Sequence, residues 1–235
     1  IRDVLGSRGL GDVYKRQSVS IEVMPLDEEE YAYLKNHGLD GLTVYQETYD
    51  EKRYSEVHLS GEKRNFKYRL DTPERGAIAG LRTIGIGALL GLGSIREDAF
   101  RTGLHLKYLM DNYPNSDFSI SFPRVNKAEG NLKDSYAVDD KTFVQIILAN
   151  RIFQPTVGIN LSTRESSHMR DNLVSLGITK FSAGSKVEVG GYSHNNESTA
   201  QFDITDSRSV EEIVDAINKR GLEVSYKEWE NIVWK

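Results

Sequence analysis

Two clusters of small and charged polar residues, each at the end of an apolar stretch, have the composition of a ligand-binding site. The first follows Ile159 and spans residues 160–165 (NLSTRE), and the second follows Phe181 and spans residues 182–186 (SAGSK). An arginine holds a carboxylate through two parallel hydrogen bonds, and a serine hydroxyl both donates and accepts. These residue types suit a small zwitterion.

Three other apolar stretches end in polar or glycine-rich residues: QETY (46–49), GIGALLG (85–91) and SISFPR (119–124). Glu47 can accept hydrogen bonds from vicinal hydroxyls, as in a ribose. Arg69, Arg124 and Arg164 each have the fork that a carboxylate requires. Gly85 and Gly87 lack a Cβ, which lets the backbone approach a ligand edge closely.

Each of these residues also has a purely structural interpretation. Glu47 and Arg69 can form an ion pair at a barrel rim, and Arg124 can be a solvated loop charge. The glycines at 85, 87 and 91 can ease helix packing, Arg164 can pair with Glu165 or Arg170 with Asp171, and Ser182 and Ser185 can be turn or cap residues. Their joint occurrence at strand ends favours the functional interpretation, because polar residues at the carboxyl ends of barrel strands build active sites.

The elements that must position these clusters alternate between strand and helix. Strands are predicted at 19–24, 42–46, 83–89, 118–122, 157–161 and 178–181. Helices are predicted after Asp27, from Thr72-Pro73, at 96–112 with Phe100, Leu104 and Tyr108 on one side, at 141–153, at 166–177 on the spacing of Met169, Leu173 and Leu176, and after Ser209. Leu222 to Tyr226 is a further possible strand.

Consecutive βα units with short β-branched strands predict a parallel sheet covered by helices. A barrel fits better than a doubly wound sheet, because every strand end carries polar residues and no glycine-rich fingerprint follows the first strand. The fold class is therefore α/β, a partial (βα)8 TIM-type barrel of about six units with the first two missing. We expect a non-native or disordered leader at 1–17, the partial barrel at 18–192, and a C-terminal helix extension at 193–235 packed on the barrel.

Composition excludes several classes of protein. The 235 residues carry a net charge of -5 with no basic cluster, so a nucleic-acid partner is not expected. The longest apolar stretch, Ile84 to Leu92, is far shorter than the roughly 18 residues of a membrane span, and a cytoplasmic location is the expectation. The chain has no cysteine, and its five histidines lack paired metal-ligand spacing, so no metal ligands are predicted.

The motifs VYQETY, YRLDTPERG, GIGALLGL, SISFPR, LSTRES and SAGSKVEVGGY, in this order, closely resemble the 2-iminoacetate synthase family. These enzymes are the tyrosine lyases of thiamine thiazole biosynthesis and belong to the radical S-adenosylmethionine superfamily. The resemblance extends from about Val19 to the C-terminus.

The resemblance implies a (βα)8 barrel in which S-adenosylmethionine is cleaved at a 4Fe–4S cluster to a 5'-deoxyadenosyl radical. That radical starts the cleavage of the Cα–Cβ bond of L-tyrosine into 2-iminoacetate (dehydroglycine) and p-cresol. Implied partners are a flavodoxin-like or ferredoxin-like electron donor and the thiazole synthase of the pathway. The matching positions assign cofactor binding to Gln46, Glu47, Arg69, Gly85 and Gly87, and substrate binding to Ser121, Arg124, Arg164, Ser182 and Ser185.

Two departures from the family pattern affect the expected activity. The three-cysteine cluster loop has no counterpart here, nor does the glycine-glutamate contact to the methionine amine, so we expect the chain alone to be inactive. The C-terminal residues 227–235 lack the cysteine extension of the hydrogenase-maturing tyrosine lyase, which favours the thiamine enzyme. The alternatives are a radical lyase of another amino acid, of the hydrogenase-maturase or tryptophan-lyase type, and a non-catalytic barrel remnant.

Overall fold

The computed structural model describes residues 18–125, 135–185 and 204–225. The predicted leader at 1–17 lies outside these ranges, and so do residues 193–203 and 226–235 of the predicted extension at 193–235. In the described residues the strands are β1 (Ser20–Ile21), β2 (Gly41–Glu47), β3 (Thr83–Ala88), β4 (Asp117–Ser121), β5 (Gly158–Leu161) and β6 (Lys180–Phe181). The helices are α2 (Glu28–Asn36), α3 (Glu51–Val57), α4 (Phe66–Leu70), α5 (Thr72–Ile78), α6 (Ile95–Asn112), α7 (Asp140–Phe153), α8 (Ser167–Leu173) and α9 (Val210–Asn218), with a short 3-10 helix at Glu62–Arg64.

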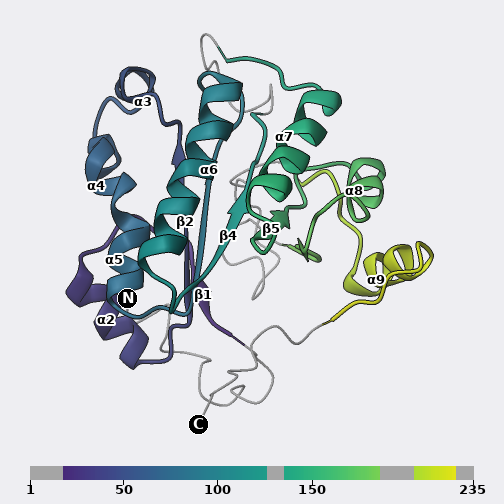
Figure 1. Ribbon diagram of the computed structural model, residues 1–235, viewed down its shortest axis with the longest axis horizontal. Helices are drawn as coiled ribbons and strands as arrows, with labels where there is room; N and C mark the ends of the chain where they lie inside the picture. Colours follow the sequence, from purple (N-terminus) through teal and green to yellow (C-terminus); the bar gives the residue numbers. More distant parts are fainter. Residues whose placement is uncertain (1–17, 126–134, 186–203, 226–235) are drawn as a thin grey trace, which may run out of the picture.

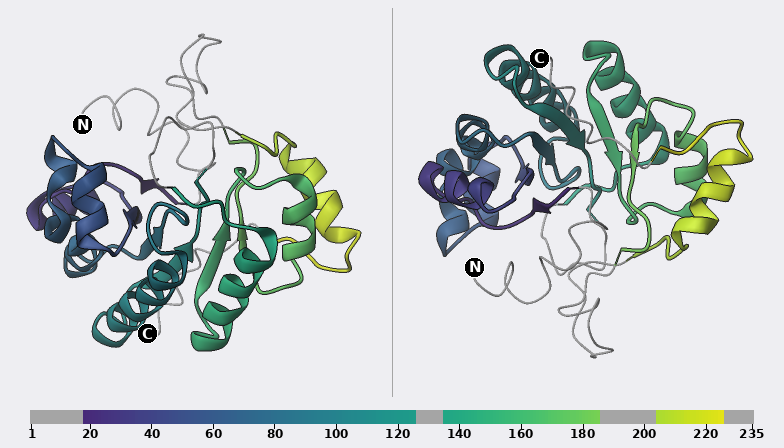
Figure 2. Two further views of the ribbon diagram at one scale, coloured as in Figure 1. Left: turned by 90° about the horizontal axis from the view of Figure 1, so that it is seen from above. Right: turned by 90° about the horizontal axis from the view of Figure 1, so that it is seen from below.

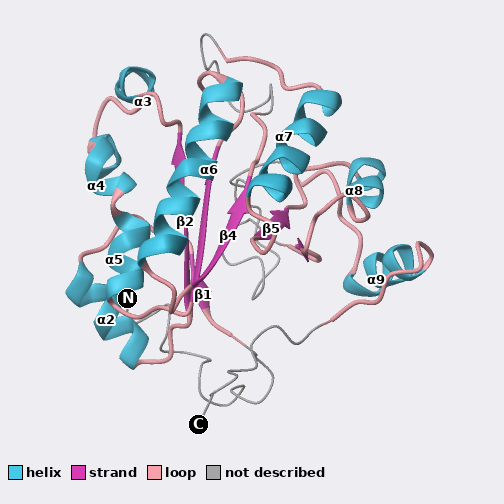
Figure 3. Cartoon of the chain, viewed as in Figure 1, coloured by secondary structure: helices cyan, strands magenta, loops and turns pink. Residues whose placement is uncertain are grey.

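The six strands form one parallel sheet in the order β1-β2-β3-β4-β5-β6, each strand paired with the next along the chain (Figures 1 and 3). Seen along the sheet, the strands follow an arc and the helices lie along its outer side (Figure 2). Sequential parallel neighbours joined by helices on one side are the arrangement of a (βα)8 barrel, since a doubly wound sheet places helices on both faces. The predicted fold class, a partial barrel, is confirmed.

The hydrophobic core lies between the outer side of the sheet and the helices. Alternate strand residues such as Leu42, Ile84 and Ile120 are buried there against Leu106 and Leu109 of α6. The opposite, concave side carries the intervening residues, which are small or polar: Thr43, Gly85, Ser119 and Gly158 share one level, and Tyr45, Gly87, Ser121 and Asn160 share the next. Barrel interiors are usually filled with bulky branched side chains, so this concave face leaves room for a ligand.

Local signals fixed the helix ends as predicted. Asp27 with Glu30 and Ser209 with Glu212 both form capping boxes, and Gly38 and Gly221 adopt the positive φ that glycine tolerates after a helix. The N-cap of α5 is Asp71 rather than Thr72, one residue earlier than predicted. No strand occurs at residues 222–225, the described part of the stretch for which one was suggested. None of the described helices is long and apolar enough to cross a membrane.

The apolar side of α6 indicated by the sequence is not the side that packs on the sheet. Phe100, Leu104 and Tyr108 are 66%, 45% and 47% exposed, whereas Leu106 and Leu109 are fully buried. Small residues on the buried face, among them Ala99 and Gly103, carry little hydrophobic signal but allow close packing: a Cβ on Gly103 would lie 3.0 Å from Asn150 Oδ1 of α7. The larger exposed side chains of Phe100, Leu104 and Tyr108 therefore gave the stronger apolar periodicity in the sequence.

This orientation predicts opposite stability effects for two substitutions on one helix. Leu106→Ala should lower the free energy of unfolding by about 2–5 kcal/mol, because it opens a cavity in the core. Phe100→Ser should change it by less than about 0.5 kcal/mol. Urea unfolding followed by circular dichroism measures both, and an equal loss in the two variants would contradict the orientation of α6.

Candidate active site

The carboxyl end of β2 holds a compact group of charges. Glu47 is the described non-glycine residue with a positive φ, 72°, and the pairing of β2 with β3 shifts register between Tyr45 and Glu47. Its carboxylate accepts hydrogen bonds from Lys63 Nζ at 2.6 Å and Arg69 Nη2 at 3.3 Å. The ion pair between Glu47 and Arg69 considered from the sequence therefore exists, and Lys63 joins it. Two cations therefore hold the carboxylate of Glu47 at this strand end.

Gln46 and Arg69 are both fixed by backbone carbonyls. Gln46 is 4% exposed, and its side-chain amide lies 3.5 Å from the carbonyl of Phe66 in α4, a long hydrogen bond. Gln46 lies between Tyr45 and Glu47 in β2, and its side chain contacts the helix layer. Arg69 Nε donates to the Tyr45 carbonyl at 2.6 Å, which orients the guanidinium across the end of β2.

The concave side of β2, β3 and β4 is closely packed around Gly87. A Cβ on Gly87 would lie 2.0 Å from the Ser121 carbonyl oxygen and 2.8 Å from Tyr45 Cδ1. Gly85 is less crowded, since its Cβ would lie 3.0 Å from Thr43 Oγ1. Glycine at 87 is thus required by the Tyr45 ring and the next strand, in addition to any ligand.

Tyr45 and Glu22 were not singled out from the sequence, yet both belong to the same electrostatic group as Arg164. Burial, the charge of Glu22 and that of Glu47 raise the pKa of Tyr45 to about 12, against the opposing effects of a Ser121 hydrogen bond and Arg164. Desolvation and Glu47 raise the pKa of Glu22, while Arg164 opposes the shift. The period-two alternation of β2 would have indicated Tyr45, because Thr43 and Tyr45 share a face.

Arg124 is engaged by several groups at the carboxyl end of β4. Its Nε donates to Glu165 Oε1 at 2.9 Å and its Nη2 to the other carboxylate oxygen, while its Nη1 donates to Asp140 at 2.7 Å and to the Val138 carbonyl. The hydrogen bonds that Arg124 donates to Glu165 and Asp140 outweigh the effect of burial and raise the pKa of Arg124. Glu165 therefore pairs with Arg124, and the suggested partnership of Arg164 with Glu165 is not the one that forms.

Ser182 and Ser185 follow β6, and the backbone of Ser182 is tied to a buried ion network. Arg170 of α8, fully buried, donates to the Ser182 carbonyl and to Asp206. Arg208 also binds Asp206, at 2.8 and 2.9 Å, and reaches Asp171 at 2.9 Å. The suggested pair of Arg170 with Asp171 is thus replaced by one that spans 36 residues, which no local pattern indicates.

Burial alone would raise the pKa of Asp206, but hydrogen bonds from Arg208 and the charge of Arg170 outweigh it and lower the pKa to about 2. Burial lowers the pKa of Arg170 as well. Burial therefore disfavours the charge on both groups, and the hydrogen bonds and opposite charges within the network keep Asp206 ionised. Thr163, adjacent to Arg164, accepts backbone hydrogen bonds from Thr205 and Asp206, so the network also holds the end of β5.

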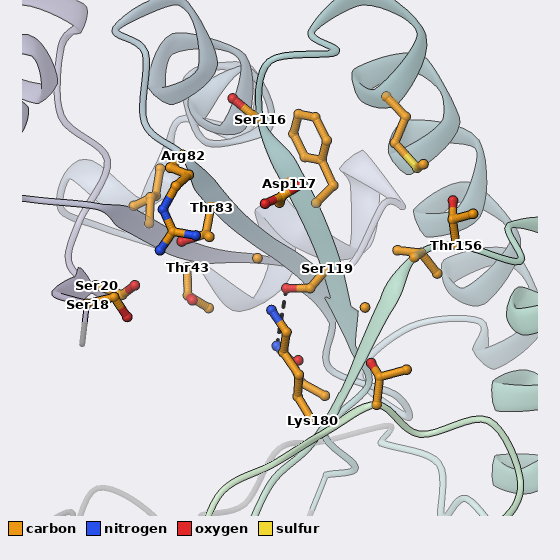
Figure 4. A pocket seen from close by; sticks show the side chains of 18 of the residues that line it. Ser18, Ser20, Thr43, Arg82, Thr83, Ser116, Asp117, Ser119, Thr156 and Lys180 are labelled. Carbon is orange, nitrogen blue, oxygen red and sulfur yellow. Dashed lines mark hydrogen bonds between the residues drawn. The ribbon is translucent and has the colours of Figure 1, made fainter. Parts of the chain in front are cut away.

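A hollow of about 850 Å³ lies at the other end of the concave face. Figure 4 shows Thr43, Ser119, Lys180, Arg82 and Asp117 among the side chains that line it. Asn160 Nδ2 donates to Ser119 Oγ at 3.2 Å within it. Among the predicted site residues, all in the described part of the chain, only Gly85 lines this hollow. Because barrel active sites form at the carboxyl ends of strands, the candidate site is the Glu47 to Arg164 end.

Iron–sulfur clusters are held by cysteine thiolates, and this chain contains no cysteine. Within the described residues, no group of three or more His, Asp or Glu side chains could hold a metal ion. The residues present therefore do not fit a cluster. They do fit an organic ligand with hydroxyl, carboxylate and amine groups, since the rim of the concave face carries Glu47, Arg69 and Arg164 above a surface of glycine and serine.

A curled parallel sheet with charged carboxyl ends and a concave face of small side chains is the frame of a (βα)8-barrel enzyme. The chain is 42% identical over 215 residues to the 2-iminoacetate synthase of Escherichia coli K12, and 40% identical over 215 residues to that of Salmonella typhimurium. Each match covers 91% of this chain. The chain is therefore a member of the radical S-adenosylmethionine superfamily and a homologue of the 2-iminoacetate synthases.

The other comparisons agree with this assignment. Residues 121–223 match the Biotin and Thiamin Synthesis associated domain. The fold is similar to a crystal structure of HydG, a maturase of the FeFe-hydrogenase, with a TM-score of 0.83 at 31% identity over 90% of this chain and 46% of that one. The chain spans 57% of the length of each of the two curated synthases.

Proposed function

We propose that this chain forms the substrate-binding part of a radical S-adenosylmethionine lyase that cleaves the Cα–Cβ bond of L-tyrosine. The products would be 2-iminoacetate and p-cresol, the former destined for the thiazole of thiamine. The observation that carries the proposal is the 42% identity to a 2-iminoacetate synthase across 91% of the chain. In this proposal the 4Fe–4S cluster is held by polypeptide outside these 235 residues, because the chain supplies no thiolate.

The residues of β2 and β3 are proposed to bind S-adenosylmethionine. When bound, this cofactor would supply the radical that abstracts a hydrogen atom from the substrate. The carboxylate of Glu47 accepts hydrogen bonds from ribose hydroxyls, while Arg69, held by the Tyr45 carbonyl, neutralises the methionine carboxylate. Gly85 and Gly87 have no side chain, so the cofactor can lie directly against the backbone of β3. Gln46, which contacts Phe66 instead, supports Glu47 from the helix side.

The residues of β4 to β6 are proposed to bind the amino acid. Arg164 holds the tyrosine carboxylate through its guanidinium fork, and the hydroxyls of Ser182 and Ser185 accept hydrogen bonds from the ammonium group. Ser121 is proposed to face the substrate beside Tyr45, whose hydroxyl stays protonated at neutral pH because its pKa is about 12. Arg124, bound to Glu165 and Asp140, holds the rim next to Arg164 in place rather than reaching the substrate on its own.

A hybrid enzyme tests the proposal. Residues 18–235 of this chain would replace the corresponding part of the Escherichia coli 2-iminoacetate synthase, and the iron content and p-cresol formation would be measured with the unaltered enzyme as control. We expect p-cresol from tyrosine and restored growth of a thiamine-requiring strain. Consumption of another amino acid instead would favour a different radical lyase, and a cluster-loaded hybrid that consumes none would favour the non-catalytic alternative.

The same experiment tests the proposed partners. A flavodoxin-like or ferredoxin-like protein should replace a chemical reductant, and added thiazole synthase should convert the 2-iminoacetate formed. A second candidate function, maturation of an FeFe-hydrogenase, is favoured by the TM-score of 0.83 to HydG. A hybrid that makes p-cresol but does not restore growth without thiamine would favour that candidate.

A further inference from the structure

Asp98, in the first turns of α6, connects that helix to the end of β2. Its side chain is 1% exposed. One carboxylate oxygen, Oδ1, accepts hydrogen bonds from Thr48 Oγ1 at 2.9 Å and from the backbone N–H of Tyr49 at 2.7 Å. Both donors directly follow Glu47, so a single carboxylate fixes the two residues after the candidate cofactor ligand.

The loop between β3 and α6 packs against the same carboxylate. A Cβ on Gly93 would lie 2.5 Å from Thr48 Oγ1 and 2.9 Å from Asp98 Oδ2. The carbonyl of Leu92 accepts a hydrogen bond from Arg53 Nε of α3 at 2.8 Å. The end of β2 and the β3–α6 loop therefore meet at Asp98, and helix α3 is bound to the same loop.

Glu47 requires such support because of its backbone. A non-glycine residue at a φ of 72° is strained, and strained residues persist only where their surroundings hold them. On one side, the Glu47 carbonyl accepts a hydrogen bond from Leu89 N at 2.8 Å. On the other side, the support comes from Asp98 through Thr48 and Tyr49.

We propose that Asp98 is a positioning residue, which holds Thr48 and Tyr49 so that Glu47 keeps its left-handed backbone and directs its carboxylate to Lys63 and Arg69. The consequence for cofactor binding rests on the function proposed above, whereas the effect on the Glu47 backbone does not. Asp98 would thus act on the cofactor end of the site without touching the ligand.

Keeping a carboxylate at this position has a cost in stability. Burial, together with the nearby charges of Asp50 and Glu97, raises the pKa of Asp98 to about 6, although the hydrogen bonds from Tyr49 and Thr48 oppose the shift. An acid whose pKa is raised in the folded state destabilises it as the pH rises from about 4 through 6. Packing alone would favour a neutral residue, so the carboxylate is better explained by the two hydrogen bonds it accepts.

Two variants and a control separate positioning from packing. Asp98→Asn keeps an acceptor oxygen, and Asp98→Ala removes both hydrogen bonds. Asp111→Asn, on the same helix but exposed and paired with Lys107, is the control. Amide exchange in this chain is the first readout. We expect exchange at Tyr49 and Leu89 to rise about tenfold in Asp98→Ala, and to stay near that of the unaltered chain in Asp98→Asn and in the control.

Faster exchange at Tyr49 without any change at Leu89 would overturn the proposal, because the disturbance would then stop short of Glu47. If Asp98→Ala does not fold, Thr48→Val removes one of the two donors and makes the same prediction for Leu89. In the hybrid enzyme, Asp98→Ala should raise KM for S-adenosylmethionine by at least about tenfold and leave KM for tyrosine unchanged. Equal changes in both constants would also overturn it. A hybrid inactive in every variant would count against the proposed function, and Leu89 exchange would still decide the role of Asp98.

Discussion

Replacing Asp206 with alanine should lower the free energy of unfolding by about 3–5 kcal/mol, because it leaves a fully buried arginine without its carboxylate. Arg170 is 0% exposed, and its guanidinium would keep only the Ser182 carbonyl among the contacts described above. The backbone hydrogen bonds from Thr205 and Asp206 to the Thr163 carbonyl would weaken at the same time. Urea unfolding at neutral pH, followed by circular dichroism, measures the loss.

Asp215→Ala is the matched control, since Asp215 lies nearby in the sequence but is exposed on α9. It should change the free energy of unfolding by less than about 0.5 kcal/mol. An isosteric Asp206→Asn variant should lose less than Asp206→Ala, because the amide oxygen still accepts one hydrogen bond from an arginine. Similar values for Asp206→Ala and Asp215→Ala would show that the buried pair contributes no specific stability.

The pH dependence of stability should have a definite sign. The pKa of Asp206 falls from an ordinary 3.8 to about 2 in the folded state. A lowered acid pKa stabilises the fold above the unfolded value, so this contribution, about 2 kcal/mol, is complete above pH 4 and is lost as the pH falls toward 2. Asp98 acts in the opposite direction, because its raised pKa makes the fold more stable as the pH falls from 6 toward 4.

The sequence predicted the architecture because the relevant signals are local. Short β-branched strands, the capping boxes at Asp27 and Ser209, and Gly38 and Gly221 each act within a few residues. The buried side of α6 was not apparent from the sequence for a local reason too, since its alanine, threonine and glycine residues have a weaker apolar signal than the exposed Phe100, Leu104 and Tyr108. Large apolar side chains therefore do not mark the buried side of a helix where close helix packing requires small residues.

The site could be predicted only in part, because its partners are distant in the sequence. Strand-end position indicated Glu47 and Arg164, and the pairing of Glu47 with Arg69 of α4 was considered in advance. The partner of Arg124, Glu165, is 41 residues away, and that of Arg170, Asp206, is 36 residues away. Charged residues alone offer several pairings of this kind, and the sheet order and helix orientation select one. The cofactor and substrate roles assigned by resemblance stay predictions.

Arg164→Lys should reduce kcat/KM for tyrosine in the hybrid enzyme by roughly 30-fold, because one of the two hydrogen bonds of the guanidinium fork is lost and such a hydrogen bond to a charged group is worth about 2 kcal/mol. Lysine keeps the charge, so the electrostatic effect on Glu22 and Tyr45 persists, but it lacks the planar fork that binds both carboxylate oxygens. The loss should therefore appear in tyrosine binding, measured by the tyrosine dependence of p-cresol formation. The KM for S-adenosylmethionine should stay unchanged.

The control for this experiment is Arg96→Lys, an equally conservative change at an exposed residue of α6. It should leave both constants as they are. An Arg164→Lys hybrid with unaltered tyrosine KM would remove Arg164 as the carboxylate ligand and shift attention to Arg124, which would then have to leave Glu165 when substrate binds. That rearrangement is testable with Glu165→Gln: a weaker hold on Arg124 would improve tyrosine binding if Arg124 is the ligand. If Arg164 is the ligand, the same change would impair binding, because the rim beside it would loosen.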